Sequence, residues 1–333
     1  MKREDFIQSS TRIRVMESKL LTKDQFNRMI EAKDIEEVVR ILNETVYANS
    51  FNRLKRPEDY EEALGYEIKE LYKEVKEIVP HPEIVDFATL KYDAHNLKVI
   101  FKDHILGRDS KDLLIDIGKI DIDNIESQAD AGDRKGIDDK YDNIASDIVD
   151  KFEKTTDPQY VELVVDLHFY ETMLKMAEKI KSERFIRYAK DYIDFSNLKA
   201  LFRMKRQNKD MAFVTSVLGK GGNISTEELE SLYFESMDNI VHRLRLKPVG
   251  DSLTKGFQDF EKTGRLSDFE KAMDDYQMEF MKETKFISYG PEVILSYLFA
   301  REIEIKNIRI ILVSKLNKLS PEFIRERLRD NYV

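Results

Sequence analysis

The chain has 333 residues, of which 41% are apolar and 36% are charged, and it contains no cysteine. This composition supplies enough apolar material for a core, does not fit a disordered chain, and excludes disulfides and thiolate metal sites. The net charge is −9, and residues 103–158 carry 16 acidic against 8 basic residues, so we expect no nucleic-acid partner.

Apolar residues recur at helical spacing along nearly the whole chain, and strand-like alternation is short wherever it occurs. The expected helices include, in chain order, two within residues 12–47 and one each at 66–78, 166–180 and 275–286. Residues 225–228 (Ser-Thr-Glu-Glu) have the form of a capping box, and Gly290-Pro291-Glu292 is expected to open another helix. Residues 127–142 form one long polar segment, which we expect to be a loop. The pattern predicts an all-α protein.

One short pattern occurs three times: an acidic residue, two further residues, then asparagine, an aliphatic residue and a basic residue. The three asparagines, Asn96, Asn197 and Asn307, lie 101 and 110 residues apart. The pairs Gly118-Lys119 and Gly219-Lys220 each begin 22 residues after an asparagine, and we interpret them as a second marker of the same repeat. A period of about one hundred residues indicates similar structural units.

These spacings predict three helical repeats in one chain. Their boundaries are placed at residues 1–115, 116–217 and 218–333. Each repeat then contains one motif helix near its end.

The acid and the asparagine of each copy lie on the same helix face as the apolar residues. Buried carboxylates and amides must be hydrogen-bonded, because otherwise their burial is costly. We interpret them as a structural network that joins the motif helix to a neighbouring helix end, with direct partner contact as the alternative. The six residues are Asp93, Asn96, Asp194, Asn197, Glu304 and Asn307.

The basic residues of the pattern project from the other side of the helix. Lys98, Lys199 and Arg309 occupy equivalent positions, and Lys102 and Arg203 follow one turn later in the first two copies. A basic helix face is commonly only solvated, and this interpretation stays open. Alternatively, equivalent bases that face a shared axis would line a positively charged socket for a partner.

The sequence offers no recognisable catalytic or metal site. Five histidines are present, and no two have a metal-ligand spacing such as H-E-x-x-H. The glycine-rich residues 219–222 lack the G-x-x-x-x-G-K-[ST] spacing of a phosphate-binding loop and are expected to form a turn. We therefore expect a protein that is not an enzyme and has no cofactor. No apolar run approaches the length of a membrane-spanning helix.

Four C-terminal segments together resemble the C subunit of bacterial and archaeal A/V-type ATP synthases, which is related to the d subunit of eukaryotic V-type ATPases. These segments are residues 275–281, 287–292, 304–317 and 321–328. Residues 12–21 and the two earlier motif copies extend the resemblance over essentially the full length. The acidic segment 126–142 does not match the family pattern.

The resemblance implies an all-helical funnel of three similar domains with approximate threefold symmetry and no active site. It further implies a central-stalk rotor subunit at the cytoplasmic face of a membrane, without a membrane span. Such a subunit receives a central shaft made of the D and F subunits, rests on the membrane rotor ring, and couples ATP turnover to ion transport. A helical-repeat adaptor unrelated to a motor is the alternative, because it would share the repeats and the lack of catalytic residues.

Overall fold

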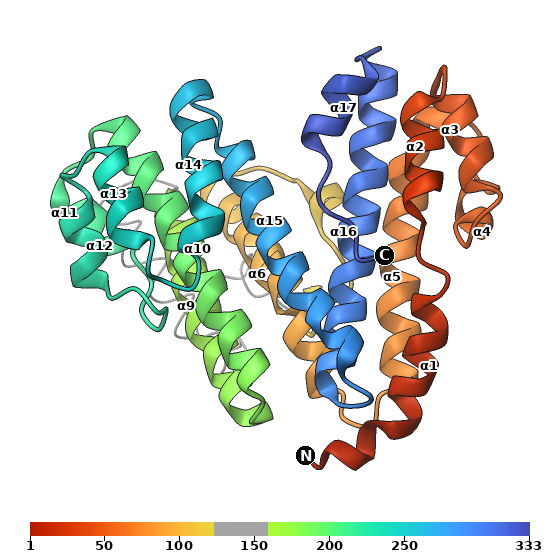
Figure 1. Cartoon of the computed structure of the whole chain (residues 1–333), viewed down its shortest axis with the longest axis horizontal. Helices are drawn as coiled ribbons and strands as arrows, with labels where there is room; N and C mark the ends of the chain where they lie inside the picture. The colour runs from red at the N-terminus through yellow and green to blue at the C-terminus, as the bar shows by residue number, and fades with distance from the viewer. Residues whose placement is uncertain (123–158) are drawn as a thin grey trace. The chain divides into compact units, whose positions relative to one another are not determined.

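The computed structural model describes residues 1–122 and 159–333, apart from the side chains of residues 251–253, 255, 259 and 261. The predicted polar loop at 127–142 lies outside this part. The described residues form helices joined by short connections and contain no strand (Figure 1). The prediction of an all-α protein is confirmed. By compactness the chain divides into two units, Met1–Val85 with Gly250–Val333, and Asp86–Val249.

The first unit is built around one long helix, α16 (Pro291–Leu316). Eighteen of its 26 residues are buried, as expected of a helix that is covered on more than one side. It packs against α1, α3, α5, α15 and α17, and Figure 1 shows it between α5 and α15. The other helices of this unit are α1 (Ile7–Glu17), α2 (Lys23–Glu31), α3 (Ile35–Leu42), α4 (Ala48–Phe51), α5 (Tyr60–Ile78), α14 (Gly250–Thr263), α15 (Leu266–Lys282) and α17 (Pro321–Arg327).

The prediction of two helices within residues 12–47 is wrong, because the chain forms α1, α2 and α3 there. The side chains of Thr22 and Asp34 cap α2 and α3 by accepting from backbone N–H groups of the first turn. Such caps satisfy donors that have no partner inside the helix, and so they start new helices within an apolar stretch. The start of α16 is confirmed, with Gly290 as its N-cap and Pro291 as its first residue.

The second unit covers Asp86–Val249. In the part of it that the structure describes, the two longest complete helices, α9 and α10, pack against each other, and shorter helices follow α10. The side chain of Ser225 accepts from the backbone N–H of Glu228 in the first turn of α12, which forms one half of the predicted capping box. The described helices of this unit are α6 (Glu83–Leu106), which enters the unit at Asp86, α9 (Gln159–Ile180), α10 (Glu183–Gln207), α11 (Met211–Val217), α12 (Thr226–Leu232) and α13 (Met237–Leu244).

Candidate interaction site around the repeated motif

The motif asparagine pairs with both backbone groups of a single residue in the loop after its helix. In the first copy, Asn96 donates to the carbonyl oxygen of Ile115 (2.8 Å) and accepts from its N–H (2.9 Å). In the second copy, Asn197 makes the same two bonds with Gly219, each 2.7 Å long. Both asparagines are 1% exposed. A buried amide thus fixes the position of each loop through two hydrogen bonds.

The motif acid holds the same loop a few residues further on. Asp93 accepts from the N–H groups of residues 119–120, at 2.8 and 3.1 Å. Asp194 accepts from those of residues 223–224, at 2.9 and 3.0 Å. Burial raises the pKa of Asp194 to about 6, against the opposing effect of these donors. Acid and amide together therefore determine where the loop leaves the motif helix.

A glycine lies against each of these carboxylates. A Cβ on Gly118 would lie 1.8 Å from an oxygen of Asp93, and a Cβ on Gly222 would lie 2.1 Å from an oxygen of Asp194. Gly118 therefore corresponds to Gly222 and not to Gly219. The interpretation of the two Gly-Lys pairs as equivalent markers is therefore wrong. The residue that the asparagine binds lies 19 residues after the asparagine in the first copy and 22 residues after it in the second.

The third copy takes its acid-bound segment from the N-terminal part of the chain. Asn307 makes the two backbone bonds with Arg329, each 2.9 Å long. Glu304, however, accepts from the N–H of Leu21 (2.5 Å), and the next residue is the N-cap of α2. In the second copy, residue 224 likewise precedes the N-cap of α12. The connection before α2 thus occupies the place that the connection before α12 occupies in the second copy.

Glu304 also belongs to a buried cluster of charged and polar groups in the first unit. Its Oε1 accepts from the hydroxyl of Tyr47 and from Arg301, each at 2.7 Å. The other terminal nitrogen of Arg301 donates to Glu67 of α5 (2.9 Å). Two carboxylates share one guanidinium here, and burial raises the pKa of Glu304. Removing one member of such a cluster leaves buried charge without a partner.

The motif helices also agree in their pattern of burial. Residues 93–101, 194–202 and 304–312 show the same order of buried and half-buried positions. The predicted basic contacts two residues after each asparagine, Lys98, Lys199 and Arg309, are half-buried, which places them at the edge of the packed face. Of the two bases one turn later, Lys102 is half-buried and Arg203 is exposed.

Two of the five predicted basic contacts form ion pairs with acids of α9. Lys98 donates to Asp166 (2.5 Å), and Lys102, one turn later, donates to Glu162. Burial raises the pKa of Glu162, but the Lys102 hydrogen bond and the charges of Lys102, Lys98 and Arg203 outweigh it and hold the pKa below its ordinary value. Two ion pairs in successive turns therefore join α6 to α9.

A cavity of about 430 Å³ adjoins these ion pairs and is lined by α9, α10 and α11. Glu162, Asp166 and Arg203 contribute charged groups to its wall, and Tyr170 and Phe213 contribute aromatic rings. Burial raises the pKa of Tyr170 further above its ordinary value, so its hydroxyl remains protonated. The cavity offers both signs of charge beside an apolar surface.

In the first unit, Arg309 donates to Glu61 of α5 (2.9 Å), and its side chain is 43% exposed. The acids that face the predicted bases are Glu61, Glu162 and Asp166, none of which was predicted from the sequence. A signal was present, because Glu61 and Glu162 both lie 35 residues before the asparagine of their own copy. The acids of α9 also repeat the four-residue spacing of Lys98 and Lys102, which suits pairing between two helices.

Within residues 1–122 and 159–333, no group of three or more His, Cys, Asp or Glu residues is arranged to hold a metal ion. None of the helices formed by these residues combines the length and the apolar character needed to cross a membrane.

Known proteins resemble the chain along nearly its whole length. A family model described as ATP synthase (C/AC39) subunit matches residues 9–327. The C subunit of the V-type sodium ATPase of Enterococcus hirae is 27% identical over 324 residues, which cover 96% of this chain and 97% of that protein. The C subunits of the A-type ATP synthases of Methanocaldococcus jannaschii and Pyrococcus horikoshii are each 26% identical, over 96% and 95% of this chain and 85% and 88% of those proteins.

Proposed function

The chain belongs to the ATP synthase (C/AC39) subunit family, and we propose that it is the central-stalk rotor subunit that couples a D–F shaft to a membrane rotor ring. As a member of this family it is a non-catalytic subunit of a rotary ATPase. Because the chain belongs to this family, the alternative of an adaptor unrelated to a motor is abandoned. In this role the protein sits on the cytoplasmic face of the membrane and carries torque between ATP turnover and ion transport.

Two ion pairs support a closed arrangement of the three predicted repeats. Lys98 of the first repeat bonds to Asp166 on a helix of the second, and Arg309 of the third bonds to Glu61 on a helix of the first. These are two of the three neighbour contacts that a ring of three copies needs. We therefore propose a pseudo-threefold funnel whose repeats span residues 1–115, 116–217 and 218–333.

In such a funnel the motif bases line the cavity that receives the shaft. An ion pair with a neighbouring helix occupies only some of the N–H donors of a lysine or arginine and limits the motion of the side chain. The remaining donors can bind acidic groups of the shaft. The proposed contacts are Lys98, Lys102, Lys199, Arg203 and Arg309.

The test is reconstitution of the rotary complex with and without this chain. We expect ATP hydrolysis by the head to persist without it and ion pumping to be lost, because the shaft would no longer turn the ring. Binding of the purified chain to the D–F shaft and to the ring should be measured separately. Ion pumping at normal efficiency in its absence would refute the proposal.

A further inference from the structure

An exposed phenylalanine lies in the connection between α15 and α16. We call residues 283–290 the tip loop. Phe286, near its middle, is 92% exposed. One exposed apolar side chain needs no explanation by itself. What distinguishes Phe286 is how firmly the backbone around it is held.

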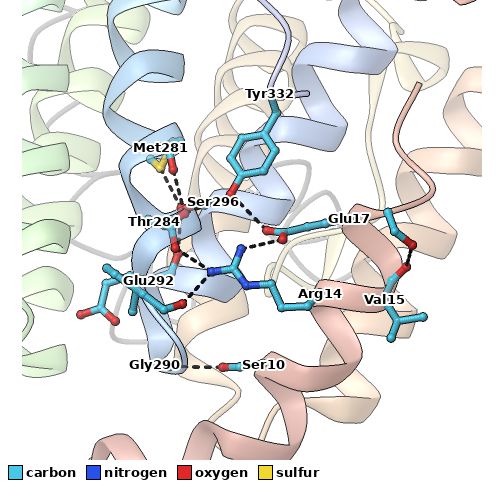
Figure 2. A network of polar contacts seen from close by, with 12 residues as sticks. Ser10, Arg14, Val15, Glu17, Met281, Thr284, Gly290, Glu292, Ser296 and Tyr332 are labelled. Atoms are coloured by element: carbon cyan, nitrogen blue, oxygen red, sulfur yellow. Dashed lines mark hydrogen bonds and ion pairs between the residues drawn. The ribbon is translucent and has the colours of Figure 1, made fainter. Parts of the chain in front are cut away.

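Arg14 of α1 binds the tip loop on both sides of the phenylalanine. Its Nη2 donates to the carbonyl oxygens of Thr284 (2.6 Å) and Ile287 (2.7 Å), while Nη1 donates to Glu17 (2.6 Å). Figure 2 shows the bonds of Arg14 to Thr284 and Glu17. The guanidinium is planar and its donors have fixed directions. One side chain therefore fixes the distance between the two carbonyl groups that flank residues 285–286.

A second set of hydrogen bonds holds the arginine and the loop together. The hydroxyl of Tyr332 donates to Glu17 (3.1 Å) and lies 3.1 Å from the hydroxyl of Thr284 (Figure 2). Tyr332 is 4% exposed and Thr284 is 1% exposed. The hydroxyl of Thr284 also donates to the carbonyl oxygen of Met281 (2.7 Å), so the loop and the arginine belong to one connected, largely buried network.

The far end of the tip loop is also attached to the N-terminal segment. Arg3 donates to the carbonyl oxygen of Tyr289 (2.9 Å), and the N–H of Gly290 donates to Ser10 (3.2 Å). The loop is thus bound at residues 284, 287, 289 and 290 by side chains of the first 14 residues.

This arrangement presents an aromatic side chain on a backbone that is already ordered. Ordering a loop during binding costs free energy, so a pre-ordered loop binds more tightly. Aromatic residues also carry much of the energy at protein interfaces when they enter a well-packed pocket. A fluid lipid surface accepts an aromatic ring in many orientations, whereas a pocket in a folded protein requires one. The fixed backbone therefore favours a protein as the partner of Phe286.

The position of the tip loop selects between the two protein partners of the proposed function. Arg309, a proposed shaft contact, lies 18 residues after Pro291 on α16, which corresponds to about 27 Å along the helix axis. The tip loop is therefore a surface separate from that contact. We propose that it docks on the membrane rotor ring, with Phe286 in an apolar pocket of the ring and Arg14 as the residue that positions the loop. This inference rests on the proposed function.

The experiment compares three full-length single variants and one double variant with the unaltered chain. Binding is measured to the purified ring, to the purified D–F shaft and to lipid vesicles. We expect Phe286→Ala to lower affinity for the ring at least tenfold, and to leave shaft affinity and the melting temperature unchanged, because the side chain is exposed. Phe234→Ala is the matched control, since Phe234 is 77% exposed in the other unit. It should bind the ring within twofold of the unaltered chain.

The third variant, Arg14→Met, tests positioning. It should weaken ring binding when Phe286 is present and have little further effect in the Phe286→Ala background, whereas a purely structural role would give equal effects in both. Unaltered ring binding by Phe286→Ala overturns the inference and leaves the proposed function intact. If Phe286→Ala weakens binding to the shaft and not to the ring, the tip loop contacts the shaft and the inference is overturned. If Phe286→Ala weakens binding only to vesicles of phosphatidylcholine and phosphatidylglycerol, the tip loop contacts lipid and the inference is likewise overturned. An unaltered chain that binds neither ring nor shaft overturns the proposed function and this inference together.

Discussion

Replacing Asn197 by leucine should destabilise the second unit by removing the two bonds between the motif helix and Gly219. Both bonds are 2.7 Å long and buried. Leucine branches at the same carbon as asparagine but can neither donate nor accept. The N–H and the carbonyl group of Gly219 would then stay buried without partners.

The expected loss follows from the cost of the two orphaned groups. An unsatisfied buried donor or acceptor costs about 1–3 kcal/mol. Two such groups in one loop, which can partly relax toward water, suggest a loss of about 2–4 kcal/mol. For a domain of this size that corresponds to a fall of about 4–16 °C in melting temperature. Asn96→Leu should cost less, because its bonds to Ile115 are only partly buried.

Urea unfolding followed by circular dichroism measures this loss, and hydrogen exchange of the peptide that contains Gly219 locates it. Asn239→Leu is the control, because Asn239 is exposed on α13, its side chain donates to the side chain of Glu235, and its backbone bond to Ser236 does not depend on the side chain. Its effect should stay within about 0.5 kcal/mol. If Asn197→Leu and Asn239→Leu unfold at the same urea concentration, the amide of Asn197 does not support the loop, which would refute the prediction.

Two further predictions concern charge. The pKa of Asp194 is raised to about 6, above the value of about 3.9 for an unfolded aspartate, so its bound proton stabilises the fold below about pH 4 and this contribution is lost as the pH rises through about 6. The unaltered chain should therefore lose free energy of unfolding relative to Asp194→Asn between pH 5 and pH 7. Urea titrations of both proteins measure this difference, and a difference that stays constant with pH would contradict the prediction. Arg309→Glu should weaken both stability and affinity for the D–F shaft, whereas Arg309→Glu with Glu61→Arg should restore the ion pair and the stability but not the affinity. Recovery of shaft affinity in the double variant would mean that Arg309 serves only the internal ion pair.

The burial of the motif acids and asparagines could be predicted from the sequence because it depends on local geometry. Residues three apart on a helix share a face, so an acid and an amide within an apolar stripe must be buried with it. The same helical geometry predicts that Lys98, Lys199 and Arg309 point away from the packed face. They lie at its edge, half-buried, because a motif helix that is packed on several sides leaves little of its surface fully exposed.

The partners of these residues could not be predicted, because they depend on which helices meet. The link from Lys98 to Asp166 joins residues 68 apart, and that from Arg309 to Glu61 joins residues 248 apart. No local pattern determines such a pairing. The tip loop was missed for a similar reason, since residues 283–286 continue the periodicity of α15 and the bonds from Arg14 cross 270 residues or more of sequence.

The third copy shows the entropic cost of contacts between segments that are far apart in the sequence. In the second copy Asp194 binds a loop that follows its own helix, whereas Glu304 must bind Leu21, 283 residues away in sequence. Bringing distant segments together has an entropic cost that local contacts avoid. The third copy differs from the others in carrying the longer glutamate, whose carboxylate also meets Tyr47 and Arg301. These added bonds offset the cost of joining distant segments, and they connect the N-terminal helices to α16 without relying on the covalent chain. In the proposed role of a torque-carrying rotor subunit, the load between these segments would pass through the buried charged cluster.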